Sequence, residues 1–440
     1  MDKIKMTKKS LILFLVILFG YILCDVINKS LYNTRNELAR LAILFLPLLI
    51  TAEETKHKLL KGSYIGITIA SLIGLAAYAN IIPKYDFAIL VDGVFRLQAI
   101  FGYANTAAVF FGIGVMLAFH YSRESGDYRF LHQIFLGVNL LSFILTLSRL
   151  SFACFFASLL LCIFIKYKNP ALRISMLSIA GIIVIAGLFM DSYYLGSTLA
   201  WRFIYWQDGF KLFLENILGK GNWQENQYFI QTANYSVKYL HNGFLQLAID
   251  GGIFALSAFI LLLFSAFKNL LTAKNKLYLL CILVFITLHG FFDIDFSFGG
   301  IFLILGIVIS FSEGEGISIK RPFVVSLSAL IILSAIFSSS LKTPVGVSDI
   351  SGMFSRAYSQ NDYEGMYALS KKWLVLAPRQ QNAYDAYYVS LTNMMKNNSD
   401  EKYRHEMQML YGQALEVNKT MNPLTRYLAA HKKIVLPEYN

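Results

Sequence analysis

Apolar runs follow one another along most of this chain, and most are long enough to cross a membrane. Eleven such runs lie at about 10–27, 38–52, 62–82, 100–119, 130–147, 151–166, 172–190, 244–267, 277–292, 298–312 and 323–340. A lipid hydrocarbon layer is crossed by roughly 17–25 helical residues, and shorter runs need support from their flanks. Because backbone groups in lipid must be satisfied within the chain, we expect these runs to be helices. The sequence therefore predicts an all-α, polytopic membrane protein with about eleven transmembrane helices.

The composition excludes a soluble globular enzyme and a disordered chain. Hydrophobic residues make up 56% of the 440 residues and charged residues only 15%, whereas soluble domains carry about 25% charged residues. A net charge of +12 would indicate a nucleic-acid partner in a soluble protein. Here Lys and Arg gather in short segments between the apolar runs, so we interpret the charge as membrane topology and expect no nucleic acid.

The basic segments also predict the orientation. Lys3, Lys5, Lys8 and Lys9 precede the first run, and the following segments on that side are richer in Lys and Arg than those on the other side. Such an excess marks the cytoplasmic face, which puts the N-terminus inside and the C-terminus outside. No small-residue cleavage site follows the first run, so we expect an uncleaved span rather than a signal peptide.

Two polar parts remain, and both are expected outside. Residues 1–341 form the predicted transmembrane domain, which includes a large outer loop at 191–243, and residues 342–440 form a polar tail. In the tail, small and aromatic residues such as Ala368 and Trp373 recur at helical spacing, as in tetratricopeptide-like helix pairs. Only about two pairs fit, so the tail is expected to lean on the membrane domain or on a partner.

Three arginines fall at or near the outer boundary of the predicted spans: Arg96, Arg149 and Arg202. A charge at that depth is costly unless it snorkels to the surface, pairs or binds a ligand. Each arginine alone is equally well explained as an interfacial anchor. Three around one vestibule favour a shared role, and the planar guanidinium grips phosphate with two hydrogen bonds. The pattern indicates a lipid-linked phosphate or pyrophosphate substrate.

Two histidines accompany the arginines. His241 ends the outer loop, and Asn242 after it is placed to cap the next helix. A neutral imidazole there can accept a proton from an attacking hydroxyl, although a capping or packing role is also open. His289 lies near Asp293 and Asp295, which are placed either to orient it or to neutralise the arginines, in a structural or a catalytic role.

Several other motifs are too incomplete to assign. Gly219-Lys220-Gly221 lacks the frame of a phosphate-binding loop and is expected to be a turn, with Lys220 near phosphate. Asp293-Ile-Asp295 has no accompanying ligand cluster, so no metal site is predicted. No dinucleotide fingerprint appears, and no cofactor is expected. The four cysteines all lie in apolar runs and are expected to be packing residues.

Together these stretches resemble the bacterial O-antigen ligase and O-antigen polymerase superfamily of polytopic glycosyltransferases. The resemblance covers roughly residues 90–310. It is carried by Arg96…Gly102…Asn105, Thr146…Ser148-Arg149, Arg202…Leu218-Gly219-x-Gly221-Asn222, and His241-Asn242-x-x-Leu245-Gln246 followed by Asp250-Gly251-Gly252.

The resemblance implies transfer of a glycan from undecaprenyl pyrophosphate to an acceptor hydroxyl, with inversion, at the outer face of the bacterial cytoplasmic membrane. It implies no nucleotide sugar and, for ligases, no metal. It gives catalytic roles to His241, which would activate the acceptor, and to Arg202, which would stabilise the leaving pyrophosphate. The substrate-binding residues would be Arg96, Asn105, Arg149, Lys220, Asn242 and His289.

The acceptor and the reaction class remain open. A ligase joins the glycan to a lipid or protein acceptor, and a polymerase joins it to another lipid-linked repeat. A polysaccharide or lipid-carrier transporter also fits many spans, but we find neither internal repeats nor broken midplane helices in the sequence. A membrane scaffold would explain the tail and leave the arginines and His241 unexplained.

Overall fold

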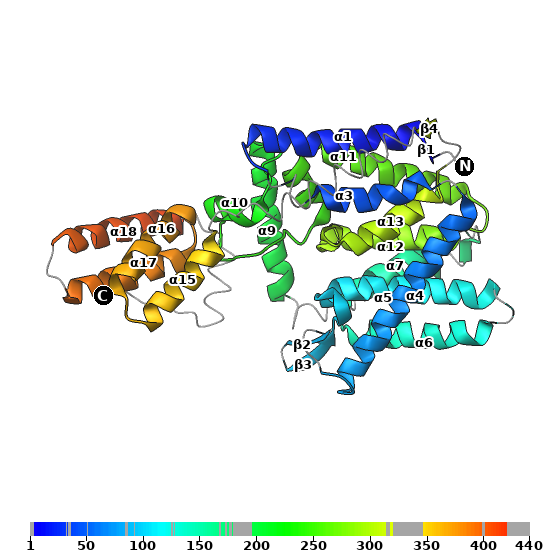
Figure 1. Cartoon of the computed structure of the whole chain (residues 1–440), viewed down its shortest axis with the longest axis horizontal. Helices are drawn as coiled ribbons and strands as arrows, with labels where there is room; N and C mark the ends of the chain where they lie inside the picture. Colours follow the sequence, from blue (N-terminus) through cyan, green and yellow to red (C-terminus); the bar gives the residue numbers. More distant parts are fainter. Residues whose placement is uncertain are drawn as a thin grey trace.

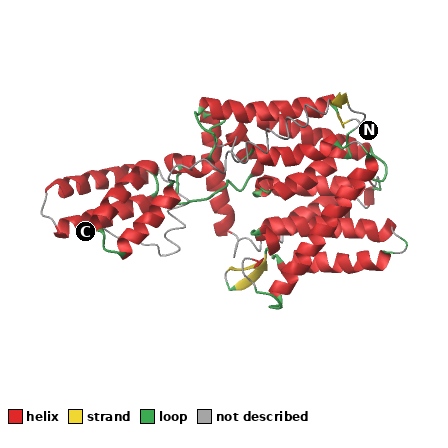
Figure 2. Cartoon of the chain, viewed as in Figure 1, coloured by secondary structure: helices red, strands yellow, loops and turns green. Residues whose placement is uncertain are grey.

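The computed structural model describes residues 4–31, 33, 37–50, 52–83, 87–91, 93–124, 126, 128–166, 169–171, 174–175, 178, 196–313, 317–319, 346–397 and 401–419. Within these residues the chain is almost entirely helical (Figure 2). The α-helices are α1 (Lys8–Ile27), α3 (Leu38–Phe45), α4 (Glu53–Tyr78), α5 (Ala104–Glu124), α6 (Arg129–Leu145), α7 (Arg149–Lys166), α9 (Gly196–Glu215), α10 (Trp223–Ile230), α11 (Gly243–Thr272), α12 (Leu277–Phe292), α13 (Gly299–Ser310), α15 (Val347–Ser359), α16 (Tyr363–Leu376), α17 (Gln381–Asn397) and α18 (Glu401–Lys419).

Short 3₁₀ helices and strands complete the described elements. The 3₁₀ helices are η1 (Leu46–Leu49), η3 (Ala99–Phe101) and η4 (Asp295–Ser297). Two antiparallel pairs of strands form, β1 (Ile4–Met6) with β4 (Ile317–Ile319), and β2 (Ala88–Val91) with β3 (Val94–Leu97). The prediction of an all-α chain is therefore confirmed apart from these short strands.

Nine of the eleven predicted apolar runs correspond to helices in the described residues. Four of these helices, α1, α4, α5 and α11, are long and apolar enough to cross a membrane. Five shorter apolar helices accompany them: Arg40–Leu49, Arg129–Leu145, Arg149–Ile165, Leu277–Phe292 and Gly299–Ser310. Most of run 172–190 and all of run 323–340 lie outside the described residues. The helices indicate a multi-pass membrane protein, and the count of eleven crossings stays a prediction.

Glycines allow the helices of this bundle to approach closely. A Cβ at Gly20 of α1 would collide with the carbonyl oxygen of Gly251 in α11, and a Cβ at Gly306 of α13 would collide with that of Leu44. Small residues at helix contacts are typical of membrane bundles, where van der Waals packing drives association. The core between the helices is continuous and largely aliphatic and aromatic.

Helix α11 is broken near the end that lies by α9. Gly252 has φ 66° and ψ −169°, a conformation that a side chain at this position could not adopt without meeting the backbone of Leu218. The turn before α10 supplies the missing hydrogen bonds: the amides of Lys220 and Gly221 donate to the Ile249 carbonyl at 2.8 and 2.9 Å. The Gly-Lys-Gly turn predicted from the sequence therefore fastens the outer loop to α11.

The four tail helices pack in chain order, each against the next. The buried residues of α15, α16 and α17 share one cluster with Tyr228 of α10. Arg379 reinforces the contact, because its Nε donates to the Gln231 carbonyl at 2.8 Å and its amide donates to the Tyr228 carbonyl at 3.2 Å. In the described residues the tail thus packs against α10 and the residue after it, in the outer loop, whereas its tetratricopeptide-like character stays a prediction.

Figure 1 shows the N-terminus, β1 and β4 at one end of the helix bundle and α15–α18 beyond the other end. The elements β4 and α15 therefore lie at opposite ends of the bundle. We call the end that carries α9, α10 and the tail the site end, because the residues described next lie there. Which face of the membrane each end occupies stays a prediction from the basic residues.

Candidate functional site

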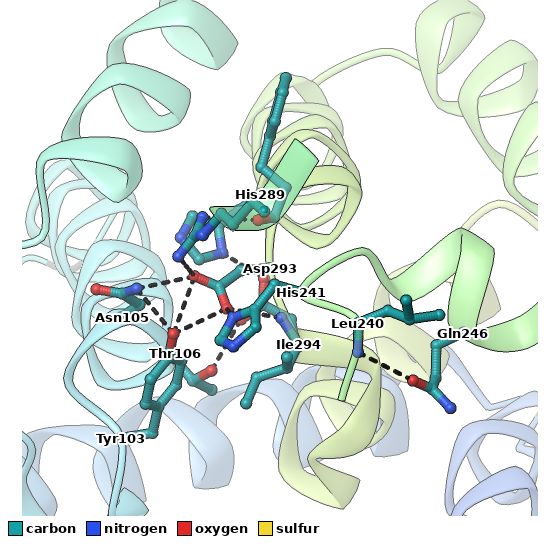
Figure 3. A network of polar contacts seen from close by, with 12 residues as sticks. Tyr103, Asn105, Thr106, Leu240, His241, Gln246, His289, Asp293 and Ile294 are labelled. Atoms are coloured by element: carbon teal, nitrogen blue, oxygen red, sulfur yellow. Dashed lines mark hydrogen bonds and ion pairs between the residues drawn. The ribbon is translucent and has the colours of Figure 1, made fainter. Parts of the chain in front are cut away.

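Asp293, the residue that follows α12, is the centre of a polar network at the site end (Figure 3). Its side chain is fully buried. Its carboxylate accepts hydrogen bonds from Arg202 Nη2 at 3.0 Å, Asn105 Nδ2 at 2.8 Å, Tyr103 Oη at 3.0 Å, His241 Nδ1 at 3.2 Å and the Ile294 amide at 2.9 Å. The donors come from the start of α5, from α9 and from the loop before α11, so the carboxylate joins three separate parts of the chain.

The surroundings keep this carboxylate ionised. Burial alone would raise the pKa of Asp293, but the hydrogen bond from His241 and the charge of Arg202 outweigh it and hold that pKa well below its usual range. Burial and the nearby Asp293 raise the pKa of Tyr103 well above its usual value, so its hydroxyl stays a donor. An ionised carboxylate only accepts hydrogen bonds, and it therefore fixes Nδ1 of His241 as the protonated nitrogen.

His241 is held in a pose that leaves its other nitrogen available. The residue has φ 53°, in the left-handed region. Trp206 Nε1 donates to the carbonyls of Leu240 and His241, each at 3.1 Å, and fixes this turn. The side chain of His241 is 23% exposed. With Nδ1 engaged by Asp293, Nε2 of a neutral imidazole carries the lone pair and can accept a proton.

Asn242 caps α11, as its position in the sequence predicts. Its side-chain oxygen accepts from the Leu245 amide at 2.9 Å. This cap starts the helix immediately after His241 and so sets where the imidazole lies. The substrate-binding role predicted for Asn242 stays a prediction. Its side-chain oxygen already accepts a hydrogen bond from the Leu245 amide.

The structure brings the three predicted arginines together. Arg96 on β3 donates from Nε to the Thr146 carbonyl at 2.9 Å and from Nη2 to Asn105 Oδ1 at 2.7 Å. Burial lowers the pKa of Arg96, and the charges of Arg149 and Arg202 act on it in the same direction. Arg202 also donates from Nη1 to the Phe292 carbonyl at 2.8 Å. The three positive charges therefore lie within electrostatic reach of one another.

Arg149 differs from the other two arginines. It is the first residue of α7 and is exposed. Among the residues that the structure describes, its guanidinium forms no hydrogen bond and no ion pair. Arg96 and Arg202 donate to protein partners, whereas no described residue accepts from the guanidinium of Arg149, whose five N–H donors stay available.

A second, fully buried network lies beside the first. His289 on α12 has no exposed surface; its Nδ1 contacts Asp295, and its Nε2 lies 2.8 Å from Ser151 Oγ. Ser151 continues to Ser148 Oγ at 2.7 Å and donates to the Asn105 carbonyl at 3.2 Å. These contacts connect α12 with α5 and with the first turn of α7, the helix that begins at Arg149. The structure thus places His289, predicted from sequence to bind substrate, inside the protein.

The His289→Ala variant separates these two roles. Loss of the imidazole leaves the buried Asp295 with the Thr106 hydroxyl but without its ionisable partner, so we expect the free energy of unfolding to fall by about 3–5 kcal/mol. Thermal unfolding of the purified variant in detergent measures this, with Ser151→Ala expected to cost about 1–3 kcal/mol. An unchanged unfolding midpoint together with a raised KM would contradict the structural role and favour contact with substrate.

The sequence did not single out every residue of the two networks, and the substrate-binding role of Lys220 stays a prediction. The amide of Lys220 donates to Ile249 at the break in α11, and among the residues that the structure describes its side chain contacts no member of the Asp293 network. Tyr103 and Ser151 were not singled out, although both lie within the stretches that carry the family resemblance or directly follow them. Asp293 was noticed only as a partner for His289 or the arginines, and its five donors show a central position that spacing alone did not reveal.

Comparison with known proteins identifies one part of the chain. A family model described as O-Antigen ligase matches residues 134–260. No curated protein and no solved structure matches the chain. The matched stretch contains Arg149, Arg202 and His241, and Asp293 lies outside it. Residues 134–260 therefore form an O-antigen ligase family domain.

Proposed function

We propose that the protein is a glycosyltransferase of the O-antigen ligase type. It would move a glycan from undecaprenyl pyrophosphate to an acceptor hydroxyl at the outer face of the bacterial cytoplasmic membrane. The family match at residues 134–260 supports the reaction class. The observation that carries the proposal is His241, whose Nδ1 is engaged by a buried, ionised Asp293 that also accepts from Arg202.

The geometry supports a single displacement. The acceptor oxygen attacks the anomeric carbon of the donor sugar while the bond from that carbon to the pyrophosphate oxygen breaks. Nε2 of His241 takes the hydroxyl proton, and Asp293 stabilises the imidazolium that results. Arg149 and Arg202 neutralise the charge that develops on the departing undecaprenyl pyrophosphate. Attack opposite the leaving group inverts the anomeric configuration, and the guanidinium groups supply the charge that a metal would otherwise bring.

The acceptor decides between two versions of this reaction. A ligase would use a lipid or protein hydroxyl, and a polymerase would use the sugar of another lipid-linked repeat. Membrane lipids and the lipid-linked donor are partners in both versions. A transporter would need no general base, and the pairing of His241 with Asp293 argues for chemistry at this site.

A transfer assay with purified protein tests the proposal. The protein is given a defined undecaprenyl-pyrophosphate oligosaccharide in nanodiscs, in the presence of EDTA. Longer lipid-linked chains would identify a polymerase, and glycan on a separately added acceptor would identify a ligase. Activity lost with EDTA and restored by a divalent cation would overturn metal independence. Absence of transfer by folded protein, together with movement of donor across a vesicle membrane, would favour a transporter.

Arg149→Lys should reduce transfer roughly 10- to 100-fold, because a lysine keeps the charge and loses the planar, two-pronged grip on phosphate. The matched control is Arg129→Lys, since Arg129 is also exposed and is also the first residue of its helix, α6. Initial rates at saturating and at low donor concentration measure the effect. A variant that retains more than half of the wild-type rate would show that charge alone is needed at residue 149.

A further inference from the structure

Helix α9 carries a row of large apolar side chains on its outside. Phe203, Phe210 and Leu214 are 54%, 54% and 56% exposed, and we call these three residues the α9 stripe. Their spacing of seven and four residues puts them on one face of the helix. The opposite face is covered, since Ile204 and Leu212 are buried in the core of the outer loop. Within the part of the chain that the structure describes, the stripe is therefore an exposed apolar surface, and the ring of Phe203 touches only Trp206 of the same helix.

Polar side chains border the stripe on one side. Gln207, Lys211 and Glu215 are exposed and follow one another at helical spacing along α9. A helix with one apolar face, one buried face and a charged border suits the boundary between lipid and water. A face turned wholly to water would not keep three large apolar residues more than half exposed in a row.

The stripe is continuous with the apolar surface of two membrane-crossing helices. Ile217 and Leu218 follow α9 and are 50% and 39% exposed. The Ile217 carbonyl accepts from the Ile253 amide of α11 at 2.9 Å. Phe254, the next residue on α11, contacts the Phe19 ring of α1 with 5.4 Å between ring centroids. Both helices are long and apolar enough to span a membrane, so the exposed apolar surface runs from lipid-facing helices onto α9.

The direction of α9 agrees with this continuity. In Figure 1, α9 runs crosswise to α1 and α11 at the site end, and it packs against α11. If α1 and α11 cross the membrane, a helix that lies across their ends is parallel to the membrane surface. Its stripe then lies at the depth where the outer parts of the acyl chains meet the headgroups.

We propose that α9 is embedded in the bilayer surface at the site end, with the α9 stripe among the lipid acyl chains. Arg202 precedes Phe203 in this helix and donates to Asp293, so the membrane would set the depth of Arg202 at the level of lipid phosphates. The placement of α9 stands without the proposed function. Only the consequence that Arg202 meets a lipid-linked pyrophosphate at this depth rests on it.

Site-directed spin labelling tests the placement without any substrate. The cysteines of the chain, Cys24, Cys154, Cys162 and Cys281, are all buried and free, so a nitroxide reagent should favour an introduced, exposed cysteine. Phe210→Cys and Leu214→Cys report on the stripe, and Lys211→Cys is the matched control on the polar border. Each variant is labelled in nanodiscs of phosphatidylethanolamine and phosphatidylglycerol, with wild-type protein carried through the same labelling to measure background.

Collision of the label with dissolved oxygen, which concentrates among acyl chains, is compared with collision with a water-soluble nickel chelate. We expect the ratio of oxygen to nickel collisions at residues 210 and 214 to be several times that at residue 211. Equal ratios at all three sites would place the stripe in water and overturn the proposal. Labels at 210 and 214 shielded from both reagents would also overturn it, because a protein partner or a second copy would then cover the stripe.

If one labelled variant fails to fold, as judged by gel filtration, Phe203→Cys and Glu215→Cys provide a second pair, on the stripe and on the polar border. The pair is interpreted in the same way, with oxygen favoured at 203 and nickel at 215. Because no donor or acceptor is present, a negative result here leaves the glycosyltransferase assay unaffected. If the labels at the stripe favour oxygen but the purified protein transfers no glycan, the placement of α9 is right and the proposed reaction is wrong.

Discussion

Asp293→Asn should lower the rate of glycan transfer by about three to four orders of magnitude and leave the protein folded. The carboxylate now accepts from both Arg202 and Nδ1 of His241. An amide of the same shape offers one oxygen and a donating nitrogen, so it cannot satisfy both partners and no longer fixes the His241 tautomer. When the carboxylate that orients a catalytic histidine in serine proteases becomes an amide, the rate falls by about 10⁴.

The depressed pKa of Asp293 also predicts how the stability of the wild-type protein depends on pH. Because the folded pKa is depressed, the ionised carboxylate stabilises the fold above the unfolded pKa of about 3.9, and that stabilisation is lost as pH falls further. The wild-type network should therefore stay intact between pH 8 and pH 5. The unfolding midpoint of wild type, compared with Asp293→Asn across this range, measures whether the network titrates.

The matched control is Asp385→Asn, at an exposed position on α17 of the tail. It should leave the transfer rate unchanged. It should also change the free energy of unfolding by no more than about 0.5 kcal/mol, as is usual for surface substitutions. If Asp293→Asn keeps more than a tenth of the wild-type rate, the role given to Asp293 in holding the base is wrong. If the variant is unfolded, Asp293→Glu tests the charge with a longer side chain.

Much of the bundle was predictable because lipid leaves few choices for the backbone. An apolar run in a membrane must be a helix, and nine predicted runs are helices in the described residues. The convergence of Arg96, Arg149 and Arg202 was also predictable, since the order of the apolar runs puts all three at or near the same predicted boundary of the spans. Hydropathy and charge suffice for statements of this kind, because they depend only on local sequence.

The strands and the break in α11 were not predicted, because they depend on contacts between distant residues. Arg96 was expected just before a helix and lies instead on β3, where it pairs with Ile89 across a short hairpin. Gly251 and Gly252 were noted as a motif, yet the break at Gly252 depends on hydrogen bonds from the Lys220 turn some 30 residues earlier in the chain. No local pattern in α11 contains that information.

The partners within the site were hidden for a similar reason. Ser151 appears in the sequence as one small polar residue in an apolar run, and such residues often bond their own backbone. Its partner His289 is 138 positions away. Asp293 likewise receives His241 from 52 positions earlier and Arg202 from 91. The residue types indicated that the two aspartates would pair with histidines or arginines. Only the fold shows that Asp293 pairs with His241 and Arg202, and Asp295 with His289.

His241→Ala should lower transfer by about 10²- to 10⁴-fold, the contribution typical of a positioned general base. Donor binding should change little, because Arg149 and Arg202 remain. Single-turnover rates and binding of labelled undecaprenyl-pyrophosphate oligosaccharide measure the two effects separately. The control is His405→Ala, at an exposed histidine on α18 in the tail, which should leave both quantities unchanged.

Rescue with added imidazole then distinguishes a base from a merely positioning residue. Removal of the His241 side chain, which is 23% exposed and hydrogen-bonded to Asp293, leaves space beside that carboxylate. Free imidazole that enters this space can take the acceptor proton, so the rate of His241→Ala should rise with the concentration of neutral imidazole and therefore with pH. Protonated imidazole has no lone pair to offer, and rescue that rises as pH falls would contradict the role of base. A variant with unimpaired transfer would remove His241 from the mechanism altogether and leave the arginines as the catalytic groups.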